Sequence, residues 1–387
     1  MKVALVHDHL NQAGGAERVL ERLHFLFPSA PIYTAILDRD SLWPGLRDAD
    51  IRVSWMQHLP GVTRHYKAYL PFYPLAIQSF DLREYDLVIS SSSAFAKAAR
   101  TRADACHVCY CHTPMRFVWD YARYVERENF GRLAGAALPL LIKALKHWDI
   151  STSRRPTAYI ANSSIVAARI NTYYGRPSEI VFPPVCVERF TPTSAIEDYY
   201  LVVSRLVPYK RVDLAISAFN TMQRPLVVIG DGPDRSALQR LAGPTVRFLG
   251  HKPDEFVAQY YARCRGLLFP GEEDFGITPL EANAAGRPVV AYARGGALDT
   301  VVDGRNGVLF HEQTVAALRA AVEQCDKIAW DAGELRRHAE RFGEPVFGGR
   351  MTEALERAVR ASGKRFALST FTTAAATADV GGPAGVG

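Results

Sequence analysis

The stretch FPGEEDFGITPLEANAAGRP, residues 269–288, joins the end of an apolar run, a turn and the start of a helix. We expect a buried strand to end at Pro270 and a turn to follow at Gly276. A helix of small residues then begins near Thr278, because a hydroxyl side chain is favoured at the N-cap and Pro279 at the first helical position. Free amides at such a helix start bind anions, so the stretch predicts a strand–turn–helix unit with an anion site at its turn.

Two carboxylates flank this turn. Glu273 lies on the rim of the loop, and Glu281 lies one helical turn into the helix. With a phosphate bound between them, one carboxylate can accept hydrogen bonds from sugar hydroxyls and the other can bind a ribose. A plain acidic loop before a core helix is the alternative, but it does not require Phe-Gly between two carboxylates.

A second strand–loop–helix unit carries cations. We expect a strand at Tyr199–Val203 and a helix at Val212–Phe219, with Arg205 and Lys210 on the loop between them. Arginine binds phosphate as a fork and lysine as a point charge, so the two side chains can converge on one diphosphate. A pair of solvated loop cations is the alternative.

The whole chain alternates short Val- and Ile-rich runs with longer segments of helical period, which is typical of parallel sheets covered by helices on both faces. A proline- and hydroxyl-rich linker at residues 183–194 separates two sets of runs. The sequence therefore predicts an α/β fold of two doubly wound, Rossmann-like domains. The expected strands are Val3–His7, Pro31–Leu37, Asp86–Ser90, His107–Cys111, Ala158–Ala161 and Ile180–Phe182, then Tyr199–Val203, Leu226–Gly230, Val246–Leu249, Gly266–Pro270, Pro288–Tyr292 and Gly307–Phe310.

The linker sets the expected domain boundaries. We expect a first domain at residues 1–192 and a second domain at residues 193–345. Residues 346–365 have an apolar stripe at helical spacing, and we expect this helix to return to the first domain. Residues 366–387 consist mainly of Ala, Thr and Gly, and we expect a disordered tail there.

Length and composition are those of a globular protein. The chain has 387 residues, 48% of them apolar and 22% charged, which excludes disordered and fibrous chains. Its longest uncharged apolar stretch, Leu133–Ile142, is half the roughly 20 residues that a membrane span needs. The N-terminus turns polar too early for a signal peptide, and the six cysteines do not resemble a disulfide framework. We expect a cytoplasmic protein.

The net charge of +6 lies entirely in residues 1–192, because the rest of the chain carries no net charge. This charge has two interpretations. It is either an ordinary solvated surface or a face directed at anionic lipid or a phosphate-bearing substrate. Arg64, Lys67 and Tyr69 belong to a segment that interleaves bases with aromatics and suits an acceptor or a membrane surface. Packing within the domain is the alternative for this segment, as it is for the apolar stripe between Leu133 and Trp148. We expect no nucleic-acid partner, because no recognition signature accompanies the charge.

Three groups of residues invite a metal interpretation. Residues 38–40 and 48–50 are Asp-x-Asp strings. Residues 106–112 contain three cysteines and two histidines, whose thiolate and imidazole groups are zinc ligands. Strand alternation sends Cys109 and Cys111 to one face and His112 to the other, so we expect no zinc site. We expect Asp38, Asp40 and the second string to be solvated loop acids. For His112, a buried structural histidine is one alternative.

Around residues 269–288 the chain resembles the retaining glycosyltransferases of family 4, which have the two-domain GT-B architecture. The resemblance implies that residues 1–192 form an acceptor-binding domain, that residues 193–345 form a nucleotide-sugar-binding domain and that the two face a cleft. The Glu-x7-Glu motif of the family is matched by Glu273 and Glu281. The resemblance implies that Glu273 contacts the donor sugar, that Glu281 binds the ribose and that amides between them hold the diphosphate. The other donor-binding positions that it implies in this turn and helix are Phe275, Gly276, Ile277, Thr278 and Leu280.

The same resemblance gives roles to residues elsewhere. It implies that Arg205 and Lys210 neutralise the diphosphate leaving group and that His112 enters the cleft. Gly14 and Gly15 match a turn that faces the diphosphate; they are not part of a Gly-x-Gly-x-x-Gly fingerprint, so a dinucleotide cofactor is not supported. The loops that would hold the nucleotide contain Asp231, His251 and Lys252, although ordinary Gly/Pro turns look similar.

The strings GGAERV (14–19), YCHTPMR (110–116) and EDFGITP (273–279) look like those of bacterial mannosyltransferases that build polysaccharide on lipid-diphosphate carriers. This implies GDP-mannose as donor, a polyprenyl-diphosphate-linked saccharide as acceptor, with Arg116 on the acceptor side, and a peripheral position on the inner face of the plasma membrane. No metal or cofactor is expected, because Arg205 and Lys210 take the place of a cation. The alternatives are a UDP-sugar donor, an epimerase or phosphorylase of the same shape, and a non-catalytic nucleotide-sugar-binding subunit.

Overall fold

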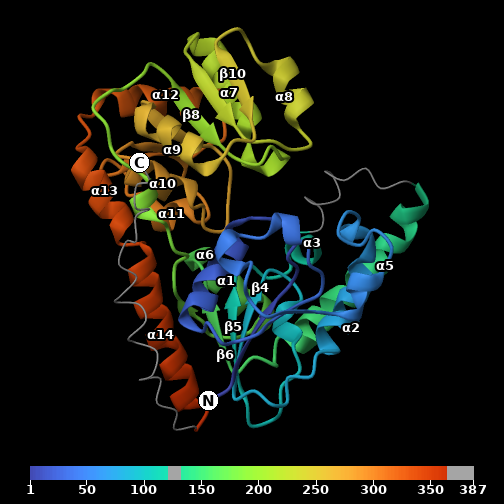
Figure 1. Ribbon diagram of the computed structural model, residues 1–387. Helices are drawn as coiled ribbons and strands as arrows, with labels where there is room; N and C mark the ends of the chain where they lie inside the picture. Colours follow the sequence, from blue (N-terminus) through green and yellow to red (C-terminus); the bar gives the residue numbers. More distant parts are fainter. Residues whose placement is uncertain (121–131, 364–387) are drawn as a thin grey trace, which may run out of the picture.

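The computed structural model describes residues 1–120 and 132–363, whose strands form two fully parallel sheets (Figure 1). The first sheet has seven strands in the order β3-β2-β1-β4-β5-β6-β7. Their bounds are β1 Val3–His7, β2 Ile32–Thr34, β3 Ile51–Val53, β4 Leu87–Ser92, β5 Cys106–Cys111, β6 Ala158–Ala161 and β7 Glu179–Ile180.

The second sheet has six strands in the order β10-β9-β8-β11-β12-β13. Their bounds are β8 Tyr200–Val203, β9 Leu226–Ile229, β10 Val246–Gly250, β11 Gly266–Phe269, β12 Val289–Tyr292 and β13 Gly307–Phe310. In both sheets the strand order reverses beside the first strand of the domain, and ligands of open α/β sheets bind at the carboxyl ends of the strands near that point.

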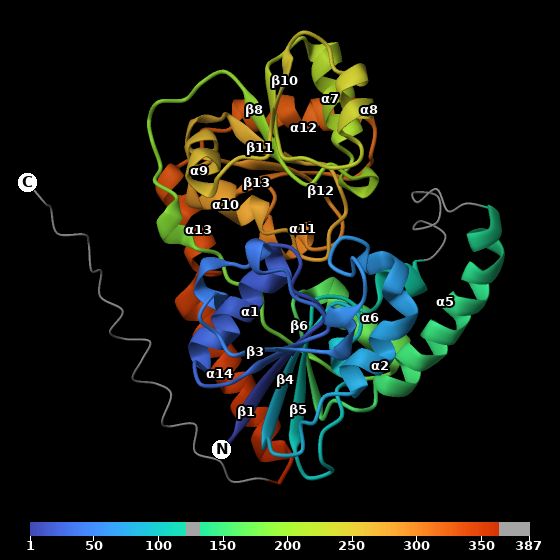
Figure 2. The ribbon, with the colours of Figure 1, turned by 45° about the vertical axis from the view of Figure 1, so that its right-hand side comes forward.

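Helices cover both faces of each sheet (Figures 1 and 2). None in the described part of the chain is long and apolar enough to cross a membrane. The helices are α1 Gly15–Leu26, α2 Tyr73–Gln78, α3 Arg116–Trp119, α5 Arg132–Thr152, α6 Ser164–Tyr174, α7 Val212–Met222, α8 Arg235–Leu241, α9 Asp254–Arg263, α10 Thr278–Ala284, α11 Ala297–Thr300, α12 Val315–Lys327, α13 Ala332–Glu340 and α14 Glu344–Ala361.

The structure confirms the predicted pair of doubly wound domains. The central strands β1, β4 and β5 are buried at every position, as expected for strands covered by helices on both faces. The expected strands correspond to all of those observed except β3. This edge strand has only three residues, Ile-Arg-Val, and none of them is fully buried, so it lacks the apolar run that identifies the others.

The last described helix crosses from the second domain to the first. α14 follows α13 and runs along the first domain beside α1 (Figure 1). Its buried residues Phe347, Met351 and Leu355 belong to the apolar core of the first sheet. The tail expected at residues 366–387 lies outside the described residues.

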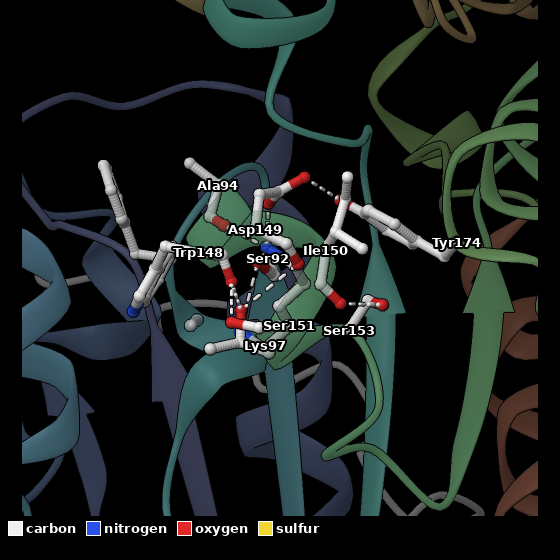
Figure 3. A network of polar contacts seen from close by, with 12 residues as sticks. Ser92, Ala94, Lys97, Trp148, Asp149, Ile150, Ser151, Ser153 and Tyr174 are labelled. Carbon is white, nitrogen blue, oxygen red and sulfur yellow. Dashed lines mark hydrogen bonds and ion pairs between the residues drawn. The ribbon is translucent and has the colours of Figure 1, made fainter. Parts of the chain in front are cut away.

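A buried ion pair joins four elements of the first domain (Figure 3). Lys97, on the short 3-10 helix after β4, pairs with Asp149 near the end of α5, and both side chains are almost fully buried. The other Asp149 oxygen accepts hydrogen bonds from Trp119 Nε1 of α3 at 2.8 Å and from the Tyr174 hydroxyl of α6 at 2.9 Å. Lys97 Nζ also donates to the Ala94 carbonyl at 2.7 Å, so the buried charges are paired and hydrogen-bonded.

Candidate functional site

The loop between β11 and α10 is shaped by close backbone packing. Gly276 has a φ of +81°, and a Cβ there would lie 2.4 Å from Phe269 Cζ. A Cβ on Gly271 would lie 2.6 Å from the Tyr209 carbonyl oxygen, so this loop packs directly on the loop after β8. Glycine is required at both positions, and it brings the carboxylates of one loop to the cations of the other.

Lys210 and Glu273 meet where these two loops touch. Their side chains form an ion pair and are both partly buried. Arg205, on the same loop as Lys210, is exposed and has no ion-pair partner within residues 1–120 and 132–363. Lys210, a predicted phosphate ligand, is therefore paired with Glu273, a predicted sugar ligand. Arg205, the other predicted phosphate ligand, is open to solvent.

The first domain contributes a cation to Glu281. Arg18 of α1 donates to a Glu281 oxygen at 3.0 Å, and the buried Tyr261 hydroxyl donates to the other at 3.1 Å. Burial acts to lower the pKa of Arg18, but the charge and hydrogen bond of Glu281 raise it overall, so Arg18 remains a cation. The guanidinium also lies 4.9 Å from the ring centre of Trp43.

The predicted glycine turn lies beside the second domain. Gly14 is the N-cap of α1, and a Cβ on Gly15 would lie 3.3 Å from the Ile277 side chain. The Gly14 amide donates to Glu17 at 2.9 Å. The turn that was predicted to face a diphosphate thus adjoins the loop that was predicted to hold it.

His112 follows the carboxyl end of β5 and is buried. Its Nε2 lies 2.8 Å from the Ser91 hydroxyl, and its ring packs edge-on against Tyr110. Burial, together with the neighbouring His7, lowers the pKa of His112 to about 4, so the ring is neutral at neutral pH.

Arg116 and Arg169 of the first domain both pair with Asp274, the residue after Glu273. Arg116 also lies 5.1 Å from the ring centre of Tyr209. Beside this cluster is a cavity of about 190 Å³, lined by Thr113, Pro114, Arg116, Trp119, Asp120, Arg169 and Tyr173. The Trp119 ring is stacked on Tyr173 with ring centres 4.1 Å apart, and Lys146 Nζ lies 4.3 Å from the Trp119 ring centre.

The loops after β8, β9 and β10 lie side by side. A Cβ on Gly230 would lie 1.9 Å from the Ser204 carbonyl oxygen, and the Gly230 amide donates to the Gly250 carbonyl at 2.9 Å. Asp231, however, uses its carboxylate locally, on the Gly232 amide and on Arg235. His251 is exposed, and Lys252 lies 5.3 Å from the ring centre of Phe256.

Of the predicted acceptor or membrane residues, Arg116 pairs with Asp274, and the other three lie in one segment of the first domain. Arg64 precedes the 3-10 helix Tyr66–Phe72, Lys67 lies within it, and both side chains are exposed. The Tyr69 hydroxyl donates to the Pro60 carbonyl at 2.7 Å. Trp55 and Phe72 are exposed and contact each other edge to face at 6.1 Å. Of the apolar stripe on α5, the side chains of residues 133–138 lie outside those described.

The Asp-x-Asp strings have local partners. Asp38 caps a short 3-10 helix through the Asp40 amide and the Ser41 hydroxyl, and Asp50 pairs with Arg52. The described residues contain no group of three or more His, Cys, Asp or Glu side chains that could hold a metal ion.

Arg18 and Arg169 were not predicted as site residues. Each lies on a helix whose local pattern is that of any amphipathic surface helix, and each reaches a carboxylate more than one hundred positions away in sequence. The one local signal for Arg18 is its place one turn after Gly14-Gly15. Arg169 has no comparable signal.

Two family models match the chain in succession. Residues 13–189 match the model described as Glycosyltransferase Family 4, and residues 190–342 match Glycosyl transferases group 1. The boundary between the matches falls in the linker between the two sheets. Together the two matches include the loops after β1, β5, β8 and β11 described above.

Relatives and solved structures agree with these matches. A GDP-mannose-dependent alpha-mannosyltransferase of Mycolicibacterium smegmatis is 40% identical over 31% of this chain and 32% of its own length. A D-inositol 3-phosphate glycosyltransferase of Gordonia bronchialis is 29% identical over 47% of this chain and 48% of its own. The chain thus spans about half the length, or less, of the curated relatives it matches. The structure of Anabaena HepE in complex with UDP is 19% identical with a TM-score of 0.68, and the match covers 92% of this chain and 100% of that one.

Proposed function

Because this chain is built from a Glycosyltransferase Family 4 domain followed by a Glycosyl transferases group 1 domain in the GT-B arrangement, we propose that it transfers a hexose from a nucleotide-diphosphate sugar to a saccharide acceptor. One observation carries the proposal. The glycine turns at Gly14-Gly15 and Gly276 adjoin each other, and Lys210, Glu273, Arg18 and Glu281 gather around them as cation–carboxylate pairs.

These pairs have the chemistry that a nucleotide sugar requires. In the proposed complex a diphosphate binds Arg205 and Lys210 and takes the place of Glu273 as the partner of Lys210. Glu273 then accepts hydrogen bonds from the donor sugar, and Glu281, still oriented by Tyr261, accepts them from the ribose. Amides of the turn around Gly276 and of the α1 start complete the phosphate site.

We propose that the reaction retains the anomeric configuration. In a front-face displacement the bond from the anomeric carbon to the diphosphate breaks, and the acceptor oxygen attacks from the same side. The leaving phosphate oxygen takes the acceptor proton. Arg205 and Lys210 stabilise the charge that develops on the diphosphate, so the proposed reaction needs no metal ion.

We propose GDP-mannose as the donor. The mannosyltransferase strings of the sequence and the printed name of the Mycolicibacterium relative support this choice, whereas the UDP bound to HepE favours a UDP-sugar as the second candidate. A donor panel separates them. Thermal unfolding should shift upward with GDP-mannose and GDP more than with UDP-glucose, UDP-galactose or UDP. Lys210→Ala should abolish the shift. A larger shift with the UDP compounds would replace GDP-mannose by a UDP-sugar, and no shift with any nucleotide would contradict the proposed site.

For the acceptor we propose a polyprenyl-diphosphate-linked saccharide, met by a protein that lies peripherally on the cytoplasmic face of the membrane. Support comes from the exposed surface formed by Trp55, Arg64, Lys67, Phe72 and Leu75. Exposed aromatic and aliphatic side chains beside cations suit a lipid interface with anionic head groups. All of the chain's positive surplus lies in the first 192 residues, which include this surface.

A further inference from the structure

Four buried polar side chains connect the glycine turn of α1 to His112. Glu17 accepts a hydrogen bond from the Gly14 amide at 2.9 Å, and its other oxygen lies 3.6 Å from His7 Nε2. His7 Nδ1 lies 3.1 Å from the Ser91 hydroxyl oxygen, which lies 2.8 Å from His112 Nε2. All four side chains are less than 10% exposed, so water does not compete for these contacts.

The sheet topology creates this line of contacts. β1 and β4 are neighbours, and their register pairs His7 with Ser91 at the carboxyl end of both strands. β5 lies on the other side of β4, and His112 is the first residue beyond its end. Glu17 reaches the same edge from the first turn of α1. Four segments spread over more than one hundred residues therefore meet where the two domains adjoin.

The positions of the protons along this line of four side chains can be assigned by starting from Glu17. Burial is the largest single influence on Glu17 and raises its pKa, but the hydrogen bond and charge of His7, with His9 and a backbone hydrogen bond, together lower the pKa of Glu17 to about 2, so Glu17 is a carboxylate. A carboxylate beside Nε2 of His7 favours a proton on that nitrogen. When that is the only ring proton of His7, Nδ1 is an acceptor, and the Ser91 hydroxyl donates to it. Ser91, which has one proton, then accepts from His112, and His112 carries its own proton on Nε2.

We propose that His7 carries a single ring proton, on Nε2, and that Glu17, His7 and Ser91 are positioning residues that hold neutral His112 in the Nε2–H tautomer. His112 Nδ1 then carries a lone pair and has no hydrogen-bond partner among residues 1–120 and 132–363. It accepts a hydrogen bond from a hydroxyl of the bound sugar. This role rests on the proposed function, but the tautomer itself does not. Glu17 also holds the Gly14 amide, so one carboxylate orders both the phosphate turn and the histidine.

The charges around the chain are compatible with this assignment. The Asp8 carboxylate accepts hydrogen bonds from the amides of residues 93–96, which lie at 2.5–2.9 Å from its oxygens. Burial lowers the pKa of His9, which stacks on Tyr66. Asp274 acts on His112 from the second domain but is paired with Arg116 and Arg169. The carboxylate that lies beside His7 Nε2 is that of Glu17, at 3.6 Å.

Nitrogen-15 NMR of histidine-labelled full-length protein at pH 7.5 tests the tautomer directly, because two-bond correlations distinguish a protonated from a bare ring nitrogen. The His112 signal is identified by its loss in His112→Gln. We expect the Nε2–H form in the wild type and in Ser91→Thr, and a mixture with the Nδ1–H form in Ser91→Ala. An Nδ1–H form in the wild type, or an unchanged Nε2–H form in Ser91→Ala, would overturn the proposal.

Ser90→Ala is the matched control. Ser90 precedes Ser91 on β4 and makes an equivalent buried contact, 2.8 Å from His107 Nε2, on the opposite face of the sheet. We expect this variant to leave the His112 tautomer and the transfer rate unchanged within about twofold. Ser91→Ala should reduce kcat/KM for transfer roughly 10- to 100-fold, and Ser91→Thr should restore most of it. A changed tautomer with unchanged transfer would refute the contact between His112 and the sugar while leaving the hydrogen-bond chain intact.

Discussion

Glu273 and Glu281 hold cations of the protein itself where a nucleotide sugar is proposed to bind. Lys210 forms an ion pair with Glu273, and Arg18 forms an ion pair with Glu281. A diphosphate is a stronger partner for Lys210 than a single carboxylate, so donor binding exchanges one ion pair for another and leaves Glu273 free for the sugar. Arg18 must either move aside or share Glu281 with the ribose.

At the residue scale we predict that Arg205→Ala and Lys210→Ala each reduce turnover by roughly 100-fold or more, because both act on leaving-group charge. Arg205 is exposed and Lys210 lies on a loop, so thermal unfolding should stay near that of the wild type. Steady-state kinetics measures the loss. Arg240→Ala, at an exposed cation of α8, is the control and should not affect turnover. Wild-type rates in folded variants would remove both residues from the site.

A second residue-scale prediction concerns the stability of the protein at acidic pH. Burial lowers the pKa of His107 to about 3 and that of His112 to about 4, below the value of 6.5 for an exposed histidine. Between these values and pH 6.5 the unfolded chain binds more protons, so stability falls as the pH falls. From pH 7.5 to pH 5 each histidine should cost on the order of 2 kcal/mol of unfolding free energy.

Denaturant unfolding at the two pH values measures this loss. Glu17 does not contribute in this window, because its stabilisation is lost only as the pH falls below about 4.5 toward its folded pKa of about 2. His107→Gln should show a smaller difference between pH 7.5 and pH 5 than the wild type. An equal difference would show that His107 is not held neutral.

At the scale of elements, the sequence predicts most of the strands because buried parallel strands are continuous apolar runs. β3 escapes prediction, since Ile51–Val53 has a central arginine and lies at the sheet edge. The predicted C-terminal helix, residues 346–365, corresponds to α14, which begins two residues earlier at Glu344 and has Pro345 in its first turn. The loops at Gly14 and Gly276 could be predicted from local turn and capping signals. Partners such as Arg18 for Glu281 could not, because contacts between domains leave no local pattern.

The pair of Lys97 and Asp149 gives a prediction about how elements are joined. Lys97→Met leaves a buried carboxylate whose remaining partners are Trp119 and Tyr174, and it should destabilise the protein by about 3–5 kcal/mol. Adding Asp149→Asn removes the uncompensated charge and keeps an oxygen acceptor, so the double variant should be more stable than Lys97→Met alone. Urea unfolding compares the two. Equal stability of the two variants would contradict the picture of Asp149 as a buried anion held by Lys97.

For the whole molecule, contacts across the domains come from several elements. Arg18 and Arg169 of the first domain bind carboxylates of the second, Asp299 accepts from the Ser164 amide at 2.9 Å, and α14 returns to the first domain. Two of these carboxylates lie at the proposed donor site, Asp274 in the loop after β11 and Glu281 in α10, whereas Asp299 lies on α11. Donor binding and the relative position of the domains are therefore linked.

The excess positive charge of the first domain gives a prediction for the whole molecule. If the surface formed by Trp55, Arg64, Lys67, Phe72 and Leu75 faces a membrane, the protein should bind anionic vesicles reversibly and more weakly as salt is added. Arg64→Glu with Lys67→Glu should reduce vesicle sedimentation and transfer to a lipid-linked acceptor together, and should leave donor hydrolysis nearly unchanged.

The matched control reverses the same number of charges on the second domain. Arg240→Glu with Lys327→Glu changes the net charge equally and lies on exposed positions of α8 and α12. This control should bind vesicles nearly as the wild type does. Equal binding by the Arg64 and Lys67 variant would instead show that the charge is an ordinary solvated surface, and the membrane contact would have to be abandoned.

The most direct test of the central claim is a transfer assay with GDP-mannose and a polyprenyl-diphosphate-linked saccharide in the presence of EDTA. Wild-type protein should release one GDP for each hexose added to the acceptor, as seen by mass spectrometry. Glu273→Gln and Lys210→Ala should lose roughly 100-fold of that rate. If the wild type transfers no hexose from GDP or UDP sugars, or transfers one only after a divalent cation is restored, the assignment of catalysis to Glu273, Arg205 and Lys210 is contradicted.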